Sequence, residues 1–526
     1  MPSRSTADHS VSPPVVRIPR DYNAAYDLIE RNLAAGRAAR VAYIDDAGQY
    51  TFSDFAQRVN RFGSGLRAMG LEMEHRVLLA LTDTIDFPTV FLGAIKVGIV
   101  PIAVNTLLTP KDYEYMLSDS RAKALIVSGQ LLSQFAPLIP KLPFLKHVIV
   151  SGSSAQGQTA FEEVLAKGKA ELAPAPTTSD DACFWLYSSG STGMPKGTVH
   201  AHSSMILTAE LYARGVLGYR EGDVVLSAAK LFFAYGLGNA LSFTLAVGAT
   251  AVLMAERPTP ASVFKRLTEK KPTLFFGVPT LYAAMLASPD FPKKESLALR
   301  QCISAGEALP AQIAKSWKER TGVEILDGIG STEMLHIFLS NRPNDLRYGT
   351  TGKPVPGYEL RLVDEHGNAV KQGEMGELQI SGPTSAAHYW NNREKSRNTF
   401  MGGWTKSGDK YSLDKDGYYV YGGRSDDMLK VSGIYVSPAE VEAALITHEA
   451  VLEAAVVGAE DENKLIKPKA FVVLKQGNSG SDALKVTLQQ HVKDKLAPYK
   501  YPRWIEFLPE LPKTATGKIQ RFKLRT

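Results

Sequence analysis

Short apolar runs alternate with helical patterns through the first 150 residues. Residues 77–81 and 99–104 are rich in branched apolar side chains, and residues 86–97 between them have the spacing of a helix. Two more short apolar runs follow, at 124–127 and 148–150. This alternation is typical of mostly parallel β-sheets that are buried under helices on both faces.

The same pattern returns after a stretch rich in glycine and serine at 188–197. Further strands are predicted at 250–254, 273–277 and 299–304. The pattern up to about residue 354 therefore predicts an α/β fold, and the length of 526 residues predicts more than one core.

Beyond about residue 354 the pattern changes. Residues 358–363 and 376–381 are strand-like runs between glycine and aspartate turns, which predicts antiparallel pairing. The last hundred residues have strand and helix patterns of their own after a polar break. We therefore predict two domains, one over residues 1–425 and a small α+β domain over residues 426–526.

Residues 231–255 contain no charged side chain and are long enough to span a bilayer. Three glycines and Asn239 interrupt this segment, and its end has the pattern of a glycine turn followed by a buried strand. Because buried α/β elements give the same apolar runs, we expect no membrane span here.

Composition narrows the range of partners. Lysine and arginine number 60 against 54 acidic residues, a net charge of +6 that suits anionic small molecules and gives a nucleic-acid role no support. Only two cysteines occur, Cys183 and Cys302, far apart and without metal-ligand spacing. With no apolar signal in residues 1–20, this cysteine usage predicts a cytoplasmic protein without disulfides or zinc.

The stretch at 187–197 carries the strongest chemical signal. Its hydroxyl groups and glycine amides can donate several hydrogen bonds to phosphate oxygens, and its lysine adds a positive charge. Pro195 stands where a P-loop needs glycine, which excludes that motif. A flexible linker is the alternative, but a strand-like run precedes the stretch. The predicted phosphate-binding residues are Ser188, Ser189, Gly190, Ser191, Thr192, Gly193 and Lys196.

Four more motifs follow in order: Gly-Ile-Gly-Ser-Thr-Glu at 328–333, Ser-Gly-Asp at 407–409, Gly-Arg-Ser-Asp-Asp at 423–427 and Pro-Lys-Thr-Ala-Thr-Gly-Lys at 512–518. Together with the phosphate loop, they resemble the signatures of the superfamily of acyl-CoA synthetases, luciferases and nonribosomal adenylation domains. The resemblance covers nearly the whole chain. Each motif is weak alone, but five in order are specific.

The resemblance implies a fold and a reaction. The large domain would combine the mostly parallel, helix-flanked sheets with a distorted barrel, and the small C-terminal domain would be mobile. The enzyme would be an ATP-dependent acid–thiol ligase. It would activate a carboxylic acid as acyl-AMP, release pyrophosphate, and then transfer the acyl group to coenzyme A. ATP and CoA would be co-substrates, with Mg²⁺ as the cofactor.

Two residues would carry the chemistry of activation. Lys518 matches the family lysine that bridges the carboxylate and the α-phosphate, a place suited to a compact cation with three donors. Glu333 matches a magnesium ligand, although Ser331-Thr332-Glu333 could instead cap a helix. Without the surrounding motif, we would interpret Lys518 as an ordinary solvent-exposed lysine.

The nucleotide would contact several other motif residues. Asp409, assisted by Arg424, resembles the residue that binds the ribose hydroxyls, although an isolated aspartate beside glycine is more often a turn former. Asp426 occupies the family hinge position, where an exposed linker acid is the alternative. Further nucleotide contacts implied by the resemblance are Gly306, Glu307, Asp327, Gly328 and Thr332.

The segment 230–239 resembles the acyl-pocket motif of the family, with Phe233 where many members have histidine. An aromatic and apolar wall suits a flat acid, although core packing could also explain the phenylalanines. The chain is most similar to ligases that activate benzoate, with hydroxy- and aminobenzoates as close alternatives. His336 could be a polar partner for the acid or a satisfied histidine beside it. The expected pocket residues are Phe233, Ala234, Tyr235, Gly328, Gly330, His336 and Ile337.

Two other classes remain open at this stage. An adenylation enzyme that loads a carrier protein shares the first half-reaction, and a non-catalytic nucleotide-binding module could keep the fold. The intact Lys518, Glu333 and Asp409 argue against the second. If Lys518 lies in an accessible loop, a lysine acyltransferase could silence adenylation by removing its charge.

Overall fold

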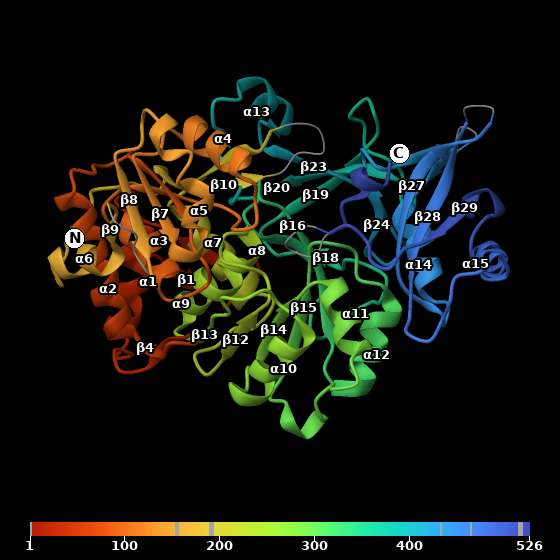
Figure 1. The fold of residues 1–526 in the computed structure, drawn as a ribbon, viewed down its shortest axis with the longest axis horizontal. Helices are drawn as coiled ribbons and strands as arrows, with labels where there is room; N and C mark the ends of the chain where they lie inside the picture. Colours follow the sequence, from red (N-terminus) through yellow and green to blue (C-terminus); the bar gives the residue numbers. More distant parts are fainter. Residues whose placement is uncertain are drawn as a thin grey trace.

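Two large β-sheets stand side by side and are built mainly from the first 350 residues (Figure 1). The computed structural model describes residues 3–152, 157–188, 194–431, 434–462, 465–513 and 519–525. In spatial order, the first sheet comprises β21 (His388–Tyr389), β11 (Lys196–Ala201), β10 (Ala182–Ser188), β6 (Val100–Ala103), β5 (Arg76–Ala80), β7 (Ala124–Ser128), β8 (His147–Ser151) and β9 (Thr159–Ala160).

The second sheet has nine strands. In spatial order they are β18 (Lys353–Pro354), β17 (Ile337–Ser340), β16 (Ile325–Gly330), β15 (Gln301–Ser304), β14 (Leu274–Gly277), β12 (Val224–Ser227), β13 (Thr250–Val252), β3 (Val41–Ile44) and β4 (Gln49–Thr51). The central strands from β16 to β3 run parallel, while β17, β18 and β4 pair antiparallel at the two ends.

Parallel pairing was predicted from the apolar runs and is confirmed. In the first sheet, Leu78 of β5 lies opposite Ile102 on one side and Leu125 on the other, and all three side chains are buried. Only the ends of the predicted strands differ, by one or two residues. Central parallel strands are apolar on both faces because helices cover both.

The helices cover these sheets. They are α1 (Ala24–Ala34), α2 (Phe52–Ala68), α3 (Asp86–Lys96), α4 (Pro110–Ser120), α5 (Leu132–Phe135), α6 (Phe161–Lys167), α7 (Ser203–Thr208), α8 (Ala234–Leu237), α9 (Phe243–Val247), α10 (Pro260–Glu269), α11 (Pro279–Ala287) and α12 (Ala311–Thr321). Two segments are π-helical: η3 (Ala209–Arg214) continues from α7, and η4 (Gly238–Ser242) lies between α8 and α9. Single 3₁₀ turns are η1 (Gly129–Leu131), η2 (Ile139–Lys141) and η5 (Lys294–Ser296), and β1 (Thr6–Asp8) pairs with β2 (Val15–Arg17).

Local sequence signals fix several helix starts. Thr51 and Asp54 form a reciprocal capping box at the start of α2, and Thr109 and Asp112 do the same for α4. Each pair satisfies backbone N–H groups that have no partner inside the helix. These starts could be read from the sequence alone.

The uncharged segment at 231–255 folds as a turn followed by α8, η4, α9 and β13, all largely buried. Within the described residues, no helix is both long and apolar enough to cross a membrane. The prediction of a buried α/β segment is therefore confirmed.

An antiparallel sheet follows, in the region where a distorted barrel was expected. Its strands are β19 (Glu359–Val363), β20 (Gly376–Ser381), β23 (Trp404–Leu413) and β22 (Phe400–Met401), with β24 (Tyr419–Arg424) also paired to β23 and α13 (Arg393–Thr399) beside it. The antiparallel pairing expected for 358–363 and 376–381 is confirmed residue by residue, from Glu359 opposite Ser381 to Val363 opposite Glu377.

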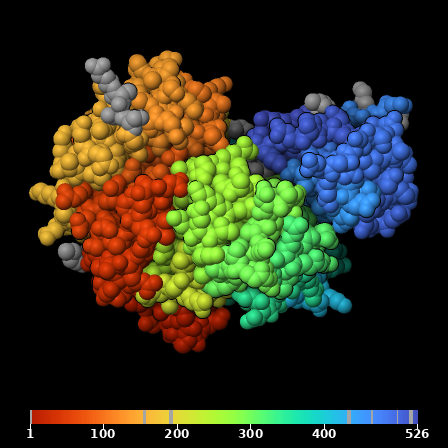
Figure 2. Space-filling model, turned by 60° about the horizontal axis from the view of Figure 1, so that its bottom comes forward, coloured from red at the N-terminus to blue at the C-terminus, as the bar shows by residue number. Residues whose placement is uncertain are grey.

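The C-terminal residues form a separate lobe on one side of the molecule (Figure 2). The elements are β25 (Leu429–Val431), β26 (Ile434–Val436), α14 (Pro438–Ile446), β27 (Val451–Glu460), β28 (Ile466–Leu474), α15 (Asp482–Lys495), η6 (Pro498–Lys500), β29 (Trp504–Phe507) and η7 (Arg521–Leu524). Apolar side chains from α14, α15 and the β27–β28–β29 sheet share one core. The predicted boundary at 425/426 lies in the turn after β24 and stays a prediction.

Candidate active site

Two buried polar atoms lie where the parallel pairing of β15 with β16 ends. Ser304 and Asp327 are opposite each other in the parallel register, and among the described residues Ser304 Oγ and Asp327 Oδ1 have no hydrogen-bond partner. Burial raises the pKa of Asp327 well above its usual range, although the backbone N–H groups of Leu309 and Gly328 act in the opposite direction. Unpartnered buried polar atoms at this edge of a sheet suit a polar ligand such as a nucleotide base.

The phosphate loop connects two antiparallel strands. Ser188 ends β10, Lys196 begins β11, and the two residues are opposite each other in the register. The predicted loop residues Ser189, Gly190, Ser191, Thr192 and Gly193 lie outside the described residues. A hairpin differs from the strand–loop–helix of a P-loop, which agrees with the exclusion of that motif.

Glu333 lies between β16 and β17 and contacts the phosphate hairpin. Its Oε1 accepts hydrogen bonds from Ser188 Oγ at 3.1 Å and from the Tyr389 hydroxyl at 2.8 Å. Residues 331–336 form turns and bends that lead directly into β17. The alternative that Glu333 caps a helix is therefore wrong, because its carboxylate is bound across the site instead of to a helix start.

Lys196 lies beside the same carboxylate. Its ammonium is 4.5 Å from the centroid of the Tyr389 ring. Burial lowers the pKa of Lys196, Glu333 acts in the opposite direction, and the cations Lys395 and Arg424 lower it further. A lysine and a glutamate this close together can hold phosphate oxygens and a divalent cation.

The groups around Glu333 are compatible with a bound magnesium ion, the role that the motif resemblance implies for this residue. Within the described residues, no three His, Cys, Asp or Glu side chains come together as a metal site. Mg²⁺ commonly takes one or two carboxylates and completes its six ligands with phosphate oxygens and water. Glu333 would hold the ion, which would neutralise charge on the phosphates.

Two residues of this cluster escaped the sequence-based prediction. Tyr389 is 56 positions from Glu333 in the chain, so only the pairing of β11 with β21 brings it near. His200 donates its Nε2–H to the carbonyl of Thr332 at 2.8 Å, and burial lowers its pKa to about 4, so the ring is neutral. The alternation of Lys196, Thr198 and His200 along one face of a strand was a usable signal.

Asp409 and Arg424 face each other across β23 and β24. Arg424 Nη1 donates to Asp409 Oδ1 at 3.2 Å and to the carbonyl of Ser407, also at 3.2 Å. Gly408 has a φ of 74°, and a Cβ there would lie 2.9 Å from Arg424 Nη2, so glycine is required beside this pair. Asp426 follows in the exposed turn after β24. The ribose and hinge roles stay predictions.

A backbone group of the C-terminal lobe contacts Glu307, a residue predicted to bind the nucleotide. The N–H of Ile519 donates to Glu307 Oε1 at 2.9 Å, and Glu307 follows Gly306, which has a φ of 97°. Ile519 is next in sequence to Lys518, which lies outside the described residues. Lys513 and Ile519 form a β-bridge, so the chain on both sides of 514–518 is held together.

His336 belongs to a different environment only three residues from Glu333. Its Nε2 lies 3.2 Å from the carbonyl of Tyr235 and 3.1 Å from Asn239 Oδ1, so this nitrogen carries the hydrogen. Burial lowers the pKa of His336 to about 3, which keeps the ring neutral. The ring packs against Phe243 and Tyr235, with centroids 4.4 and 5.6 Å away.

Three glycines allow this packing. A Cβ at Gly238 would lie 2.3 Å from His336 Cδ2, and one at Gly330 would lie 2.5 Å from the carbonyl oxygen of His336. At Gly328 a Cβ would lie 3.2 Å from the side chain of Ile337. Glycine is therefore needed at 238 and 330, and at 328 a larger residue would have to displace the side chain of Ile337 by a few tenths of an ångström.

Of the remaining predicted pocket residues, Tyr235 is hydrogen-bonded to the second sheet. Its hydroxyl donates to the carbonyl of Ile303 at the end of β15, 3.3 Å away. Phe233 stands just before α8 with its ring 4.5 Å from that of Phe232, and Ala234 is the first residue of α8. Contact of Phe233 and Ala234 with an acyl group stays a prediction.

Comparison with known proteins adds independent evidence. A family profile described as AMP-binding enzyme matches residues 30–390, and one described as AMP-binding enzyme C-terminal domain matches residues 440–518. The chain is 66% identical to a benzoate–CoA ligase of Thauera aromatica, over 99% of both chains. It is 51% identical to a 4-hydroxybenzoate–CoA/benzoate–CoA ligase of Rhodopseudomonas palustris, over 96% of this chain and 94% of the relative.

Solved structures agree. The crystal structure of a benzoate CoA ligase from Burkholderia xenovorans LB400 matches with a TM-score of 0.90 and 54% identity, over 96% of this chain and all of the other. The anthranilate CoA ligase AuaEII, in complex with anthranoyl-AMP, matches with a TM-score of 0.93 and 47% identity, over 96% and 97% of the two chains. Together with the site described above, these matches show that the chain belongs to the AMP-binding enzyme family.

Proposed function

We propose that this protein is an AMP-forming acid–thiol ligase that converts benzoate, ATP and CoA into benzoyl-CoA, AMP and pyrophosphate. One observation carries the proposal: the loop between β16 and β17 joins two unlike environments. Glu333 lies among a lysine and hydroxyl groups, and His336 lies among aromatic rings. An acid with an apolar body could therefore present its carboxylate to a bound nucleotide.

In the first half-reaction, a carboxylate oxygen attacks the α-phosphorus of ATP, and the bond to the β-phosphate oxygen breaks as pyrophosphate leaves. No protein nucleophile is needed, because positioning and positive charge do most of the work. Lys518 would bridge the two anions, Lys196 would bind phosphate oxygens, and Glu333 would hold the magnesium ion. The contact of Ile519 with Glu307 supports this role for Lys518, because Lys518 directly precedes Ile519 in the sequence.

In the second half-reaction, the sulfur of CoA attacks the carbonyl carbon, the bond to the AMP oxygen breaks, and the thiol proton is released. The thiol needs access to the carbonyl beside Lys518, so the C-terminal lobe would turn about Asp426 and break the Ile519–Glu307 contact. The exposed turn that contains Asp426 supports a hinge there.

Unsubstituted benzoate is the proposed acid because the predicted pocket is built from aromatic and apolar groups, and because the relative with 66% identity is a benzoate–CoA ligase. A ring that carries an amino or hydroxyl group is the second candidate. His336 Nδ1 is a buried acceptor without a partner among the described residues, and it could accept a hydrogen bond from such a group.

Two properties outside catalysis are part of the proposal. Cys183 and Cys302 are both unpaired and buried, which supports a reducing, cytoplasmic environment. Acylation of Lys518 by a lysine acyltransferase would remove the charge that bridges the two anions and stop adenylation.

The test is benzoate-dependent ATP–pyrophosphate exchange without CoA, followed by addition of CoA and detection of benzoyl-CoA and AMP. Hydroxy- and aminobenzoates are compared in the same assay, and a carrier protein replaces CoA in a parallel reaction. Exchange with benzoate and thioester on CoA addition would support the proposal. Faster turnover of an aminobenzoate would overturn the choice of acid, and acyl transfer only to the carrier would overturn the choice of acceptor.

A further inference from the structure

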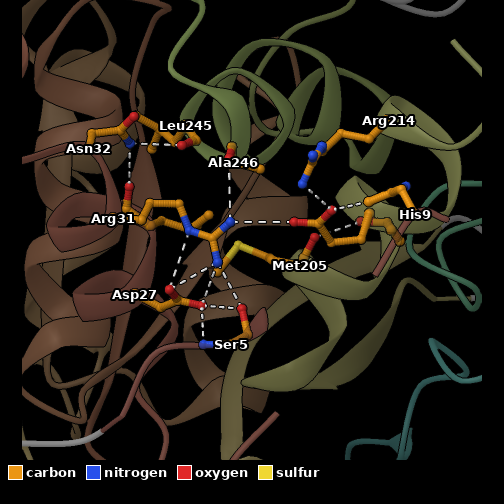
Figure 3. A network of polar contacts seen from close by, with 12 residues as sticks. Ser5, His9, Asp27, Arg31, Asn32, Met205, Arg214, Leu245 and Ala246 are labelled. Carbon is orange, nitrogen blue, oxygen red and sulfur yellow. Dashed lines mark hydrogen bonds and ion pairs between the residues drawn. The ribbon is translucent and has the colours of Figure 1, made fainter. Parts of the chain in front are cut away.

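A buried ionic network lies outside the residues predicted for the active site (Figure 3). Arg31 of α1 is at its centre, with Nη2 2.9 Å from Asp27 Oδ2 and Nη1 3.4 Å from Glu210 Oε1. The side chains of Arg31, Asp27 and Glu210 are only 14%, 0% and 3% exposed. Charges withdrawn from water in this way are stable only when each one is paired.

Glu210 binds three nitrogen groups from three segments. Besides Arg31, its Oε2 lies 2.7 Å from His9 Nε2 in the N-terminal segment and 2.8 Å from Arg214 Nη1 one turn further along the same helix. Ser5, also N-terminal, donates its hydroxyl to Asp27 at 2.5 Å. The N-terminal segment is thereby fixed to α1 and to η3.

Glu210 is the second residue of the π-helix η3. The N–H of Gly215 donates to the carbonyl of Glu210, five positions earlier, at 3.1 Å, and a Cβ at Gly215 would lie 2.4 Å from the carbonyl oxygen of Leu211. Single-turn π-segments are rare and occur frequently at functional sites. The ion pairs of Glu210 with His9 and Arg31 join η3 to segments outside that helix.

The side of η3 opposite Glu210 contacts the residues predicted to bind the acid, here called the acyl end of the site. Tyr212, two residues after Glu210, is fully buried with its ring centroid 5.6 Å from that of His336, and its hydroxyl lies 3.3 Å from Ser340 Oγ. The second π-segment, η4, contributes Asn239, which accepts from His336 Nε2. Both π-helices thus contact the one histidine of the predicted pocket.

We propose that Glu210 is a positioning residue for the acyl end: its ion pairs hold η3 in the π form and thereby set Tyr212 against His336. Each α-helical residue turns by about 100°. If η3 relaxed to α-helical hydrogen bonding, Tyr212 would rotate away from the His336 ring and the aryl pocket would change shape. This inference rests on the proposed function, because it concerns the pocket for the acid.

The experiment compares Glu210→Gln with wild type in benzoate-dependent turnover, with the KM for benzoate and the KM for ATP measured separately. We expect the KM for benzoate to rise about fivefold or more, and the KM for ATP to stay within about twofold. The matched control is Glu221→Gln, which removes the charge of an exposed glutamate that pairs with Arg37 and Arg40. Both KM values should stay within about twofold in that control.

A second variant, Arg214→Gln, tests the inference if Glu210→Gln does not fold. Arg214 forms one of the ion pairs of Glu210, and because its side chain is 39% exposed, its replacement should disturb folding less. It should raise the KM for benzoate less, in the same direction. An unchanged KM for benzoate in both variants, or an equal rise in the KM for ATP, would overturn the inference. Wild-type turnover of benzoate in the same series tests the proposed function separately, so the two failures are distinguishable.

Discussion

The two ends of the candidate site are built on opposite principles. At the nucleotide end, Lys196, Glu333 and the Asp409–Arg424 pair place formal charges among hydroxyl groups and backbone amides. At the acyl end, a neutral His336 is packed among aromatic rings at places where only glycine fits. The first end is therefore suited to a charged ligand, and the second to a ligand of matching shape.

This difference teaches how each end should respond to mutation. Removal of a charge leaves a phosphate or a metal without its partner, and the chemical step should fail. Addition of a methyl group to the packed end should displace an aromatic wall, and binding of the acid should weaken while the nucleotide end stays intact. The predictions below test this separation, from the largest expected effect to the smallest.

Lys518→Ala should lower benzoate-dependent ATP–pyrophosphate exchange by about 10³-fold, because it removes the cation proposed to bridge two anions. Exchange is measured at saturating benzoate and ATP. Lys523→Ala is the control, an exposed lysine five residues further on. Equal activity of the two variants would remove Lys518 from the mechanism.

Glu333→Gln should lower exchange by about 10²-fold and raise the Mg²⁺ concentration needed for half-maximal rate, since the amide is a weaker ligand than the carboxylate. Magnesium titrations of both enzymes measure this. Glu324→Gln is a close match, because Glu324 also accepts from a tyrosine hydroxyl and contacts a lysine. A normal Mg²⁺ titration in Glu333→Gln would contradict the proposed metal ligand.

Gly238→Ala should raise the KM for benzoate about tenfold and leave the KM for ATP unchanged, because the new Cβ would lie 2.3 Å from the His336 ring. Overpacking should also cost about 1–3 kcal/mol of unfolding free energy. Gly222→Ala is the control, since a Cβ there meets nothing within 4 Å. If both KM values rose together, the two ends would not be separable.

His336→Asn should flatten the dependence of stability on pH. The folded-state pKa of His336 is about 3, below its ordinary value of 6.5, so between these values the unfolded chain binds more protons and wild-type stability falls as the pH is lowered. From pH 7 to 5 this one group should account for a loss of about 2 kcal/mol. Denaturant unfolding at both pH values measures it, with the exposed His366→Asn as control.

If His336→Asn and wild type lose the same free energy between pH 7 and 5, His336 is not held neutral by burial. The outcome concerns the acyl end alone, because His200, the buried histidine at the nucleotide end, is unchanged in both proteins.

Several residues of the candidate site could be proposed from the sequence because they lie in short local motifs. The phosphate loop and Glu333 each follow a strand and lie beside glycine and hydroxyl residues that mark a turn, and such turns depend on a few neighbouring positions. Asp409 lies inside β23, next to Ser407 and Gly408 of its motif. The strand pattern at 77–104 also predicted parallel pairing, since continuous apolar runs suit strands that are covered on both faces. The helix-cap alternative for Glu333 was excluded only when its contacts were known.

The sequence by itself therefore determined the α/β class and the order of the motifs, and it supplied the charged residues that are predicted for the nucleotide end. Tertiary structure alone decided that Tyr389 reaches Glu333, that Asn239 and Tyr212 contact His336, and that Glu210 links the N-terminal segment to η3. The physical reason is distance along the chain. Turn chemistry and apolar periodicity act over a few residues, whereas these contacts join positions that only sheet pairing and core packing bring together.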